Sequence, residues 1–313
     1  MKYNRYTKHT PNVSEVGLGA WQLGDHSGWK SMTEKEAITL VHQALEAGVN
    51  FFDTAPNYGL GTSEIRLGKA FQGLDRSKIV VNTKFGHTAE GKTNYRADHI
   101  RTSLEGSLRR LGFDYVDSLI IHNPPFETLN GNKNPHYEIL ERLKEEGKIR
   151  AYGASLDTYD EMKLFMDTTD GEVIEAFFNI LHQDAARAFE QAKAQSVGII
   201  VKIPLDSGWL SGKYNAESTF DDIRKRWSKS DIATRAALVE KVKDILGPKR
   251  DLSQSAIAFC LAFDAVSTVI PGNASPTQLR SNLKAADQQL SVELVQQLVE
   301  FYGNEVAKLR LPW

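Results

Sequence analysis

The stretch VNFFDTAPNYGLGTSEIRLGKAF, residues 49–71, contains a strand, a loop and a helix in succession. The apolar run at 49–53 has the length of a buried strand, and residues 63–71 place apolar side chains at helical spacing. The strand ends on Asp53, and a loop rich in Pro, Asn and Gly then carries Tyr58. A strand followed by a helix is the repeating unit of parallel α/β folds, so this stretch predicts such a fold if the unit recurs.

The same unit recurs along the whole chain. The predicted strands are residues 16–21, 49–53, 78–84, 115–122, 149–155, 172–179, 197–204 and 267–272. The predicted helices are residues 33–48, 63–71, 98–112, 135–147, about 158–167, 185–195, segments within 231–263, and 275–287. The strands are almost continuously apolar, as expected when both faces of a parallel sheet are buried. Eight strand–helix pairs without a linker or a composition break predict a single-domain α/β protein, a (β/α)8 TIM barrel over residues 1–313.

The main alternative fold is a doubly wound open sheet. That fold normally carries the pattern G-x-G-x-x-G after its first strand, where the glycines approach a pyrophosphate. The first predicted strand here gives GLGAWQLG, residues 17–24, and its glycines do not fit the pattern. The barrel is therefore the preferred prediction.

Composition narrows the class of protein. The 38 basic and 40 acidic residues give a net charge of −2, which does not favour binding to nucleic acid or to an anionic membrane surface. The N-terminus is polar and no run of 18 apolar residues exists, so we expect no signal peptide, no membrane span and a cytoplasmic location. The single cysteine, Cys260, lies in an apolar run and is expected to be a buried core residue. Cys and His show no zinc-type spacing, so no metal site is predicted.

The carboxyl ends of the predicted strands carry a recurring set of polar side chains. Chemistry in a (β/α)8 barrel lies at these ends. Strand two ends on Asp53 with Tyr58 in the next loop, strand three ends on Lys84, and strand four ends on His122. Each residue alone has an ordinary explanation, such as a helix cap, a loop tyrosine, a solvent-facing lysine or a histidine bonded to its own backbone. Four such residues at successive strand ends favour a shared site.

Together these four residues suit the protonation of a carbonyl oxygen. A phenol with a pKa of about 10 is a poor acid at neutral pH, and a neighbouring lysine cation makes proton donation easier. An aspartate beside the lysine would keep it charged, and a histidine near the phenol would help to position the substrate oxygen. The hydride for such a reaction must come from a cofactor, because no side chain supplies one.

These motifs resemble the aldo-keto reductases, from GLGAWQLG to QLRSNLKAAD at residues 278–287. The most specific pieces are FFDTAPNYGLGTSEIRLGKAF, VVNTKFG, YVDSLIIHNPP, GKIRAYGAS, PLDSGWLSGKY and STVIPGNASPTQLRSNL. Among subgroups the chain looks like the bacterial ones that have an insertion after strand seven, which falls here at about residues 214–250. The resemblance implies that Asp53, Tyr58, Lys84 and His122 form the catalytic tetrad.

The resemblance also implies an extended nicotinamide cofactor, NADP or NAD, across the barrel mouth. Ser155 and Asn179 would meet the carboxamide, residues 205–213 would wrap the pyrophosphate, and Asn282 would meet the adenine. Trp21 and Asn123 are the expected substrate contacts, with a core tryptophan as the equal alternative for Trp21. The implied cofactor-binding residues are Ser155, Glu175, Asn179, Lys202, Pro204, Leu205, Ser207, Gly208, Leu210, Ser211, Lys213, Gly272, Asn273, Gln278 and Asn282.

Three positions at the nicotinamide end depart from the family pattern. Leu156 stands where Asn usually follows the serine, Glu175 where a glutamine is usual, and Lys202 where an aromatic residue usually stacks on the ring. Since an unpaired charge in an enclosed site is costly, Glu175 and Lys202 are predicted to form an ion pair. The alternative is that both side chains turn to solvent.

Cofactor choice follows from the positive charges near the predicted adenosine end. The strand-eight loop, residues 272–278, has no Lys or Arg to bind a 2′-phosphate, so NAD is expected to be accepted. Arg280 is nearest in sequence, and Arg224 and Arg226 in the insertion are the other candidates. The sequence indicates neither the oligomeric state nor the identity of the substrate.

The predicted function is an NAD(P)-dependent oxidoreductase that interconverts a small carbonyl compound (an aldehyde, ketone or sugar) and its alcohol, with Tyr58 as proton donor. One alternative is a barrel that binds the cofactor and regulates a partner with little turnover. Another is an aldose dehydrogenase that acts mainly in the oxidative direction. The expected partner is a small molecule rather than a nucleic acid or a membrane.

Overall fold

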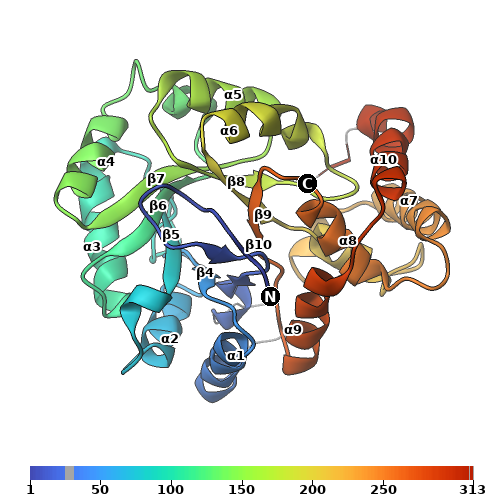
Figure 1. Cartoon of the computed structure of the whole chain (residues 1–313), viewed down its shortest axis with the longest axis horizontal. Helices are drawn as coiled ribbons and strands as arrows, with labels where there is room; N and C mark the ends of the chain where they lie inside the picture. The colour runs from blue at the N-terminus through green and yellow to red at the C-terminus, as the bar shows by residue number, and fades with distance from the viewer. Residues whose placement is uncertain (25–31, 310, 313) are drawn as a thin grey trace.

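The computed structural model describes residues 1–24, 32–309 and 311–312, and its centre is a parallel sheet of eight strands (Figure 1). The strands follow one another in chain order around the sheet. They are β3 (Leu18–Gly19), β4 (Phe51–Asp53), β5 (Val80–Phe85), β6 (Val116–His122), β7 (Ile149–Leu156), β8 (Val173–Phe177), β9 (Gly198–Lys202) and β10 (Val266–Val269).

The sheet closes on itself between its first and last strands. Parallel bridges join Val16 to Val269 and Gly19 to Gly272. The amide of Gly17 donates to the Val269 carbonyl at 2.9 Å, and the Val269 amide donates to the Glu15 carbonyl at 2.9 Å. The predicted single-domain (β/α)8 barrel is confirmed, and the open-sheet alternative is excluded by this closure.

Helices surround the barrel and begin or end largely where the sequence predicts. They are α1 (Glu34–Glu46), α2 (Thr62–Ala70), α3 (Ile100–Leu111), α4 (His136–Glu145), α5 (Tyr159–Thr168), α6 (Phe189–Ala194), α7 (Lys229–Leu246), α8 (Leu252–Leu261), α9 (Pro276–Leu283) and α10 (Val292–Phe301). Thr33 begins α1 with a capping box to Glu36. Gly112 ends α3 with a left-handed φ of 70°, a conformation that glycine adopts without strain.

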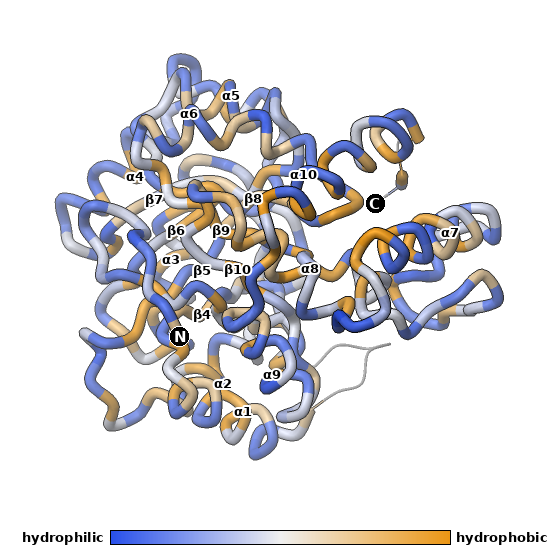
Figure 2. The backbone as a smooth tube through the Cα atoms, turned by 45° about the vertical axis from the view of Figure 1, so that its right-hand side comes forward, coloured by the Kyte–Doolittle hydropathy of each residue, from blue (hydrophilic) through white to orange (hydrophobic). Residues whose placement is uncertain are grey.

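The segment after β9 adds structure on one side of the barrel. The predicted insertion, residues 214–250, contains the 3-10 turn η7 (Ile223–Arg226) and α7. Figures 1 and 2 show α7 and α10 outside α8 on the same side of the molecule. The α7 tube in Figure 2 alternates between hydrophobic and hydrophilic residues, as expected for a helix with one packed face.

The barrel interior has its own small apolar core. Phe51, Val80, Ile120 and further strand residues fill it, and Tyr6 joins them from the N-terminal segment. A larger core lies between the strands and the helices and includes Cys260, which is fully buried in α8 as predicted. Along the described residues, no helix has the length and apolar character needed to cross a membrane.

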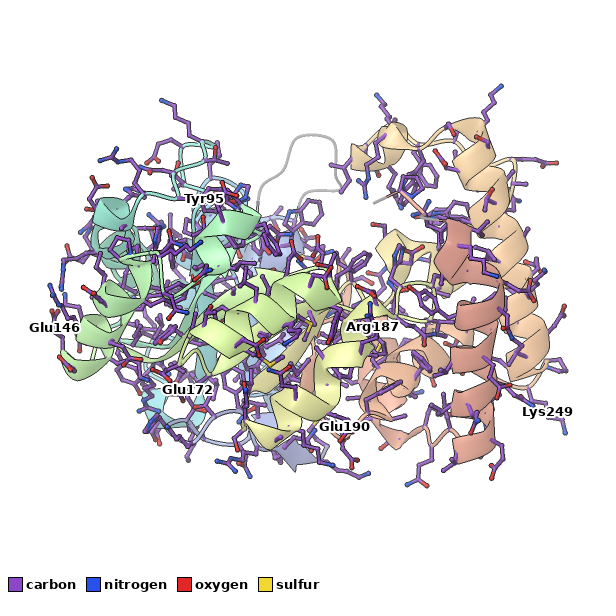
Figure 3. The ribbon with its side chains drawn as sticks, turned by 90° about the horizontal axis from the view of Figure 1, so that it is seen from above. Tyr95, Glu146, Glu172, Arg187, Glu190 and Lys249 are labelled. Atoms are coloured by element: carbon purple, nitrogen blue, oxygen red, sulfur yellow. The ribbon has the colours of Figure 1, made fainter. Side chains whose placement is uncertain are left out.

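Figure 3 shows in which direction the strands run. Tyr95, which follows β5, lies near the top, and Glu172, which precedes β8, lies lower. The carboxyl ends of the strands therefore face the top of that view. The hairpin of β1 (Tyr3–Asn4) and β2 (Val13–Ser14) contacts β10 and supplies Tyr6 to the interior at the opposite, amino end.

Candidate active site

A cavity of about 650 Å³ opens at the carboxyl ends of the strands. This volume falls within the range of small-molecule sites, roughly 300–1,000 Å³. The predicted site residues that line it are Trp21, Asp53, Tyr58, His122, Asn123, Glu175, Lys202, Pro204, Leu205, Ser207, Gly208, Ser211, Lys213, Gly272, Gln278 and Asn282. The strand ends thus converge on one cavity, as the barrel geometry requires.

Lys84 lies below the cavity and is completely buried. Its ammonium group contacts Asp53 Oδ1 at 2.6 Å and Glu175 Oε2 at 3.0 Å, and it donates to the Thr54 carbonyl at 3.1 Å. These partners come from β4, β8 and the residue after β4, so the closed barrel brings them together from opposite sides. A buried cation is tolerated because its charge is balanced and its donors are used.

Tyr58 is held above Lys84 by a tight turn. The Tyr58 amide donates to the Ala55 carbonyl at 3.1 Å, and the Tyr58 carbonyl accepts from Ser63, in the first turn of α2. Lys84 Nζ lies 5.2 Å from the centre of the phenol ring, and the His122 ring lies edge-on at 5.8 Å. The structure therefore brings the four predicted tetrad residues together.

The electrostatics of this group differ in part from the expectation. Burial raises the pKa of Tyr58 by more than the Lys84 cation lowers it, so the phenol keeps its proton at neutral pH. Burial opposes the charge of Lys84, but Asp53 and Glu175 raise its pKa and keep it cationic. Burial and the nearby charge of Lys84 lower the pKa of His122 well below its ordinary value, which makes its ring neutral.

Asp53 is the group whose charge changes near neutrality. Burial and the negative charge of Glu175 raise its pKa to about 7, against the opposing effect of Lys84. Burial also disfavours the charge of Glu175, but Lys84 and Lys202 together lower the pKa of that carboxyl. Burial and the charges around Lys84 thus leave the pKa of Asp53 raised and that of Glu175 lowered.

The predicted ion pair between Glu175 and Lys202 is wrong. Glu175 pairs with Lys84, and Lys202 pairs with Asp157 at 2.7 Å. The alternative of two solvent-facing side chains is also wrong, because Glu175 is 2% and Lys202 8% exposed. Among the described residues, Ser155 connects the two: its hydroxyl accepts from Lys202 at 2.9 Å and lies 3.1 Å from Glu175 Oε1.

The strand end that carries His122 is fixed by Tyr95 and His87. The Tyr95 hydroxyl lies 2.7 Å from the His122 carbonyl oxygen and 2.9 Å from His87 Nε2. The Tyr95 ring packs directly over Gly86, where a Cβ would come within 2.3 Å of it. These supporting residues were missed, since nothing in their spacing marks them.

The loop after β9 is anchored from behind. Asp206 is fully buried and pairs with Arg235 of α7 at 3.2 Å, while His182 lies 3.4 Å from it. Gly208 has a φ of 95°, and a Cβ there would come within 3.0 Å of the Tyr214 ring. The insertion therefore holds the loop that faces the cavity.

The loop after β10 lines the other end of the cavity with neutral polar groups. Ser275 caps α9 by accepting from the Gln278 amide. The Asn282 side-chain amide donates to Asn273 Oδ1 at 2.8 Å, and Asn273 is buried behind the cavity wall. Within the described part of residues 272–282, no Lys or Arg lines the cavity.

Of the arginines predicted as candidates for the adenosine end, only Arg224 reaches the cavity. Its guanidinium group is bonded to Asp222 and to the Tyr214 hydroxyl. Arg226 and Arg280 are absent from the described cavity wall. The charge of Arg224 is therefore already balanced.

Five predicted residues lie outside the described cavity wall, namely Lys84, Ser155, Asn179, Leu210 and Asn273. The Asn179 side chain donates to the Ile203 carbonyl at 3.0 Å and accepts from the Leu181 amide at 2.8 Å. The carboxamide contacts predicted for Ser155 and Asn179 stay predictions. The wall also contains residues that were not predicted, among them Gln22, Tyr214, Ile223, Ser253, Thr277 and Ser281.

Comparison with known proteins gives a consistent result. The sequence matches the Aldo/keto reductase family over residues 15–302. It is 30% identical over 292 residues to L-galactose dehydrogenase of Arabidopsis thaliana, covering 91% of this chain and 88% of that one. It is 29% identical over 305 residues to the NADH-specific methylglyoxal reductase of Escherichia coli K12, covering 89% and 91%.

The fold is also similar to a solved structure. The aldo-keto reductase AKR11C1 from Bacillus halodurans, in its holo form, superimposes with a TM-score of 0.81 at 27% sequence identity. The match covers 96% of each chain. The likeness therefore extends over the barrel and the segments that surround it.

Proposed function

The chain belongs to the aldo/keto reductase family, and on that premise we propose that it is a nicotinamide-dependent oxidoreductase acting on a small carbonyl compound and its alcohol. The observation that carries the proposal is the buried Lys84 cation, held between two carboxylates below the Tyr58 phenol. The names of two relatives, an L-galactose dehydrogenase and a methylglyoxal reductase, support a sugar or a small aldehyde as the substrate class.

The residues around the cavity fit a dinucleotide. Gly208 and Gly272 allow close approach of a ligand to the backbone, and Ser207, Gln278 and Asn282 offer neutral hydrogen-bonding groups at the wall. We propose that these residues hold the cofactor, with Glu175, Lys202 and Asn123 beside its nicotinamide end. When bound, the nicotinamide supplies the hydride that side chains lack.

In carbonyl reduction, Tyr58 donates its phenolic proton to the substrate oxygen. The Lys84 cation stabilises the phenolate that remains and reduces the effect of burial on the Tyr58 pKa. Asp53 and Glu175 keep Lys84 charged and aimed below the phenol. His122 is neutral, so it orients the substrate oxygen as a hydrogen-bonding group without competing as an acid.

In alcohol oxidation the same residues work in reverse. The Tyr58 phenolate takes the hydroxyl proton, and the substrate carbon would give its hydride to the oxidised form of the cofactor held in the cavity. One site serves both directions, so the aldose dehydrogenase alternative differs only in which substrates it prefers. Comparing kcat/KM for aldoses with kcat/KM for short aldehydes separates the two functions.

We propose that NAD is accepted as cofactor. The support is the neutral loop after β10 and the Asp222 carboxylate that already neutralises Arg224. The name of the Escherichia coli relative, which states NADH specificity, agrees with this choice. Lys213 is the remaining exposed cation among the described wall residues that lie in or after the β9 loop.

The test is turnover of aldehydes and sugars by the purified protein with NADH and NADPH. Tyr58→Phe should lower kcat/KM by at least about 10²-fold, because general acid catalysis contributes roughly 10²–10⁴. Tyr152→Phe, which removes a buried hydroxyl away from the cavity, should have little effect. Wild-type turnover in Tyr58→Phe would refute the mechanism, and cofactor binding without turnover in the wild type would favour the regulatory alternative.

A further inference from the structure

A column of hydrogen bonds runs through the barrel interior to Asp53. The Tyr6 hydroxyl lies 2.7 Å from Ser118 Oγ, and Ser118 Oγ lies 2.6 Å from Asn82 Oδ1. The Asn82 amide nitrogen then contacts Asp53 Oδ1 at 2.7 Å, the same oxygen that Lys84 contacts at 2.6 Å. The column thus joins the amino end of the barrel to the lysine below the cavity.

Asp53, at the upper end of the column, determines which group donates in each hydrogen bond. An ionised carboxylate accepts only, so the Asn82 amide nitrogen must donate to Asp53. The Asn82 oxygen is then free to accept from the Ser118 hydroxyl, and Ser118 in turn accepts from the Tyr6 hydroxyl. All the donors point towards Asp53, an arrangement in which each bond polarises the next.

Strand register explains why these side chains meet. Asn82 of β5 is paired with Asp53 of β4 on one side and with Ser118 of β6 on the other, so the three lie side by side in one interior layer. Tyr6 reaches this layer from below, where its ring packs edge-on against Phe51 at 5.2 Å. All the members of the column are at most 2% exposed.

Two backbone features hold the ends of the column in place. A Cβ at position 198 would lie 2.3 Å from the Tyr6 carbonyl oxygen, so Gly198 is needed for Tyr6 to enter the barrel. At the upper end, the Asn82 carbonyl accepts from the Thr54 amide at 2.9 Å, next to the Thr54 carbonyl that accepts from Lys84. Asn82 therefore contacts the site through both its side chain and its backbone.

We infer that Tyr6, Ser118 and Asn82 are positioning residues, which hold Asp53 ionised and directed at Lys84 from beneath the cavity. The inference rests on the proposed function of the tetrad. It extends that function to a tyrosine at the opposite end of the barrel, which no substrate in the cavity reaches.

The consequence for Asp53 follows from the groups that face it. These titratable groups are Lys84 from β5, Glu175 from β8, Tyr58 from the loop and Tyr6 from below. Donation by Asn82 favours the charged form of Asp53 and opposes the effects of burial and of Glu175. Removing a donor from the column should raise the pH at which Asp53 becomes ionised.

The experiment uses Asn82→Ala, Ser118→Ala and Tyr6→Phe in the full chain. The readout is a carbon-13 NMR titration of side-chain carboxyls, in which Asp53→Asn identifies the Asp53 signal. One lost hydrogen bond corresponds to a shift of about half to one pH unit. The midpoint should rise most in Asn82→Ala, less in Ser118→Ala and least in Tyr6→Phe, and the acid limb of kcat/KM should move in the same order.

Tyr152→Phe is the matched control, because it removes a buried hydroxyl outside the column and should leave the midpoint unchanged. If Ser118→Ala and Tyr6→Phe both titrate like the wild type, the inference is wrong, and this holds even if Asn82→Ala fails to fold. The titration requires no turnover. If the midpoints shift but the protein shows no turnover, the positioning role is supported and the proposed function is refuted. If the protein shows turnover but the midpoints do not shift, the proposed function is supported and the positioning role is refuted.

Discussion

Replacing Glu175 with glutamine removes one of the two carboxylates that contact Lys84 while keeping the shape of the side chain. In the wild type Lys84 is shared between Asp53 at 2.6 Å and Glu175 at 3.0 Å. A glutamine oxygen can replace Glu175 Oε2 against Lys84, and the amide nitrogen can then donate to the Ser155 hydroxyl oxygen. The substitution therefore changes charge with little change in packing.

The expected effect is a lower pKa for Asp53. In the wild type its pKa is about 7, and Glu175 is the second largest cause after burial. An opposite charge at short range shifts a carboxyl pKa by about 1–3 units. With a like charge taken to act with the same size and the opposite sign, its removal should return Asp53 towards its ordinary value by that amount. The acid limb of kcat/KM should then move to lower pH by about 1–3 units, which leaves Asp53 ionised throughout the neutral range.

The free energy of unfolding should also depend on pH through the raised pKa of Asp53. A carboxyl whose pKa is raised on folding stabilises the protein while protonated, and this contribution is lost as pH rises from about 4 to about 7. Glu175→Gln should reduce that loss by about 1.4 kcal/mol for each unit by which the Asp53 pKa falls. Thermal unfolding from pH 4 to pH 8 measures the difference between variant and wild type.

The matched control is Glu172→Gln, which lies three residues earlier in the chain. Glu172 pairs with Lys144 at 2.8 Å near the amino end of the barrel, away from the cavity (Figure 3). The Glu172→Gln variant should have the acid limb of kcat/KM at the same pH as the wild type. An acid limb that stays in place in Glu175→Gln, or that moves to higher pH, would refute the electrostatic reasoning about Lys84.

Three further predictions concern the cavity wall and the buried pair that anchors the loop after β9. Lys202→Tyr should raise the affinity for the oxidised nicotinamide relative to the reduced one, because it removes a cation; an unchanged ratio of dissociation constants would show that Lys202 does not act on the cofactor. Side-by-side affinities for NADH and NADPH should differ by less than about a hundredfold, since Arg224 is the described wall arginine and is already paired. Asp206→Asn should destabilise the fold by about 3–5 kcal/mol in urea unfolding, because Arg235 loses its buried partner; a loss below 1 kcal/mol would contradict the anchoring role of Asp206.

The fold could be predicted because its signals are local. Each strand is a short apolar run, each helix has its own spacing, and their regular alternation leaves few topologies. The hairpin at Tyr3–Ser14 and the helix α10 were missed, since the hairpin strands have two residues each and α10 follows the last strand–helix pair. The helix predicted from residue 98 begins at Ile100, because Asp98 lies in a 3-10 turn and bonds to Arg96.

The positions of the site residues and the pairing of Asp53 with Lys84 were predicted, whereas the partners of Glu175 and Lys202 were missed. Strand ends indicate which side chains reach the cavity, and this rule placed Tyr58 and His122 there. It does not indicate which charges pair, because the closed barrel brings together residues from strands that are not neighbours in the sheet. Lys84 and Glu175 meet across the interior from β5 and β8, and Asp157 comes from a loop that no motif marks.

The charges at the wall of the cavity and directly below it form one unit, because Ser155 connects its two halves. Lys84 with Asp53 and Glu175 forms the first half, and Lys202 with Asp157 forms the second. The Ser155 hydroxyl has a single proton, and with Lys202 donating to its oxygen it bonds either to Glu175 or to Asn123, each at 3.1 Å.

When Ser155 donates to Glu175, it favours the charged form of the carboxylate that raises the Asp53 pKa. When the Ser155 hydroxyl donates to Asn123, Glu175 loses this hydrogen bond, and its charged form then depends more strongly on Lys84. A ligand that engages Asn123 at the cavity wall would therefore change the charge balance around Lys84 without touching the lysine. Glu175 and Lys202 therefore act on each other without an ion pair, through the Ser155 hydroxyl and through the Lys202 charge that lowers the Glu175 pKa.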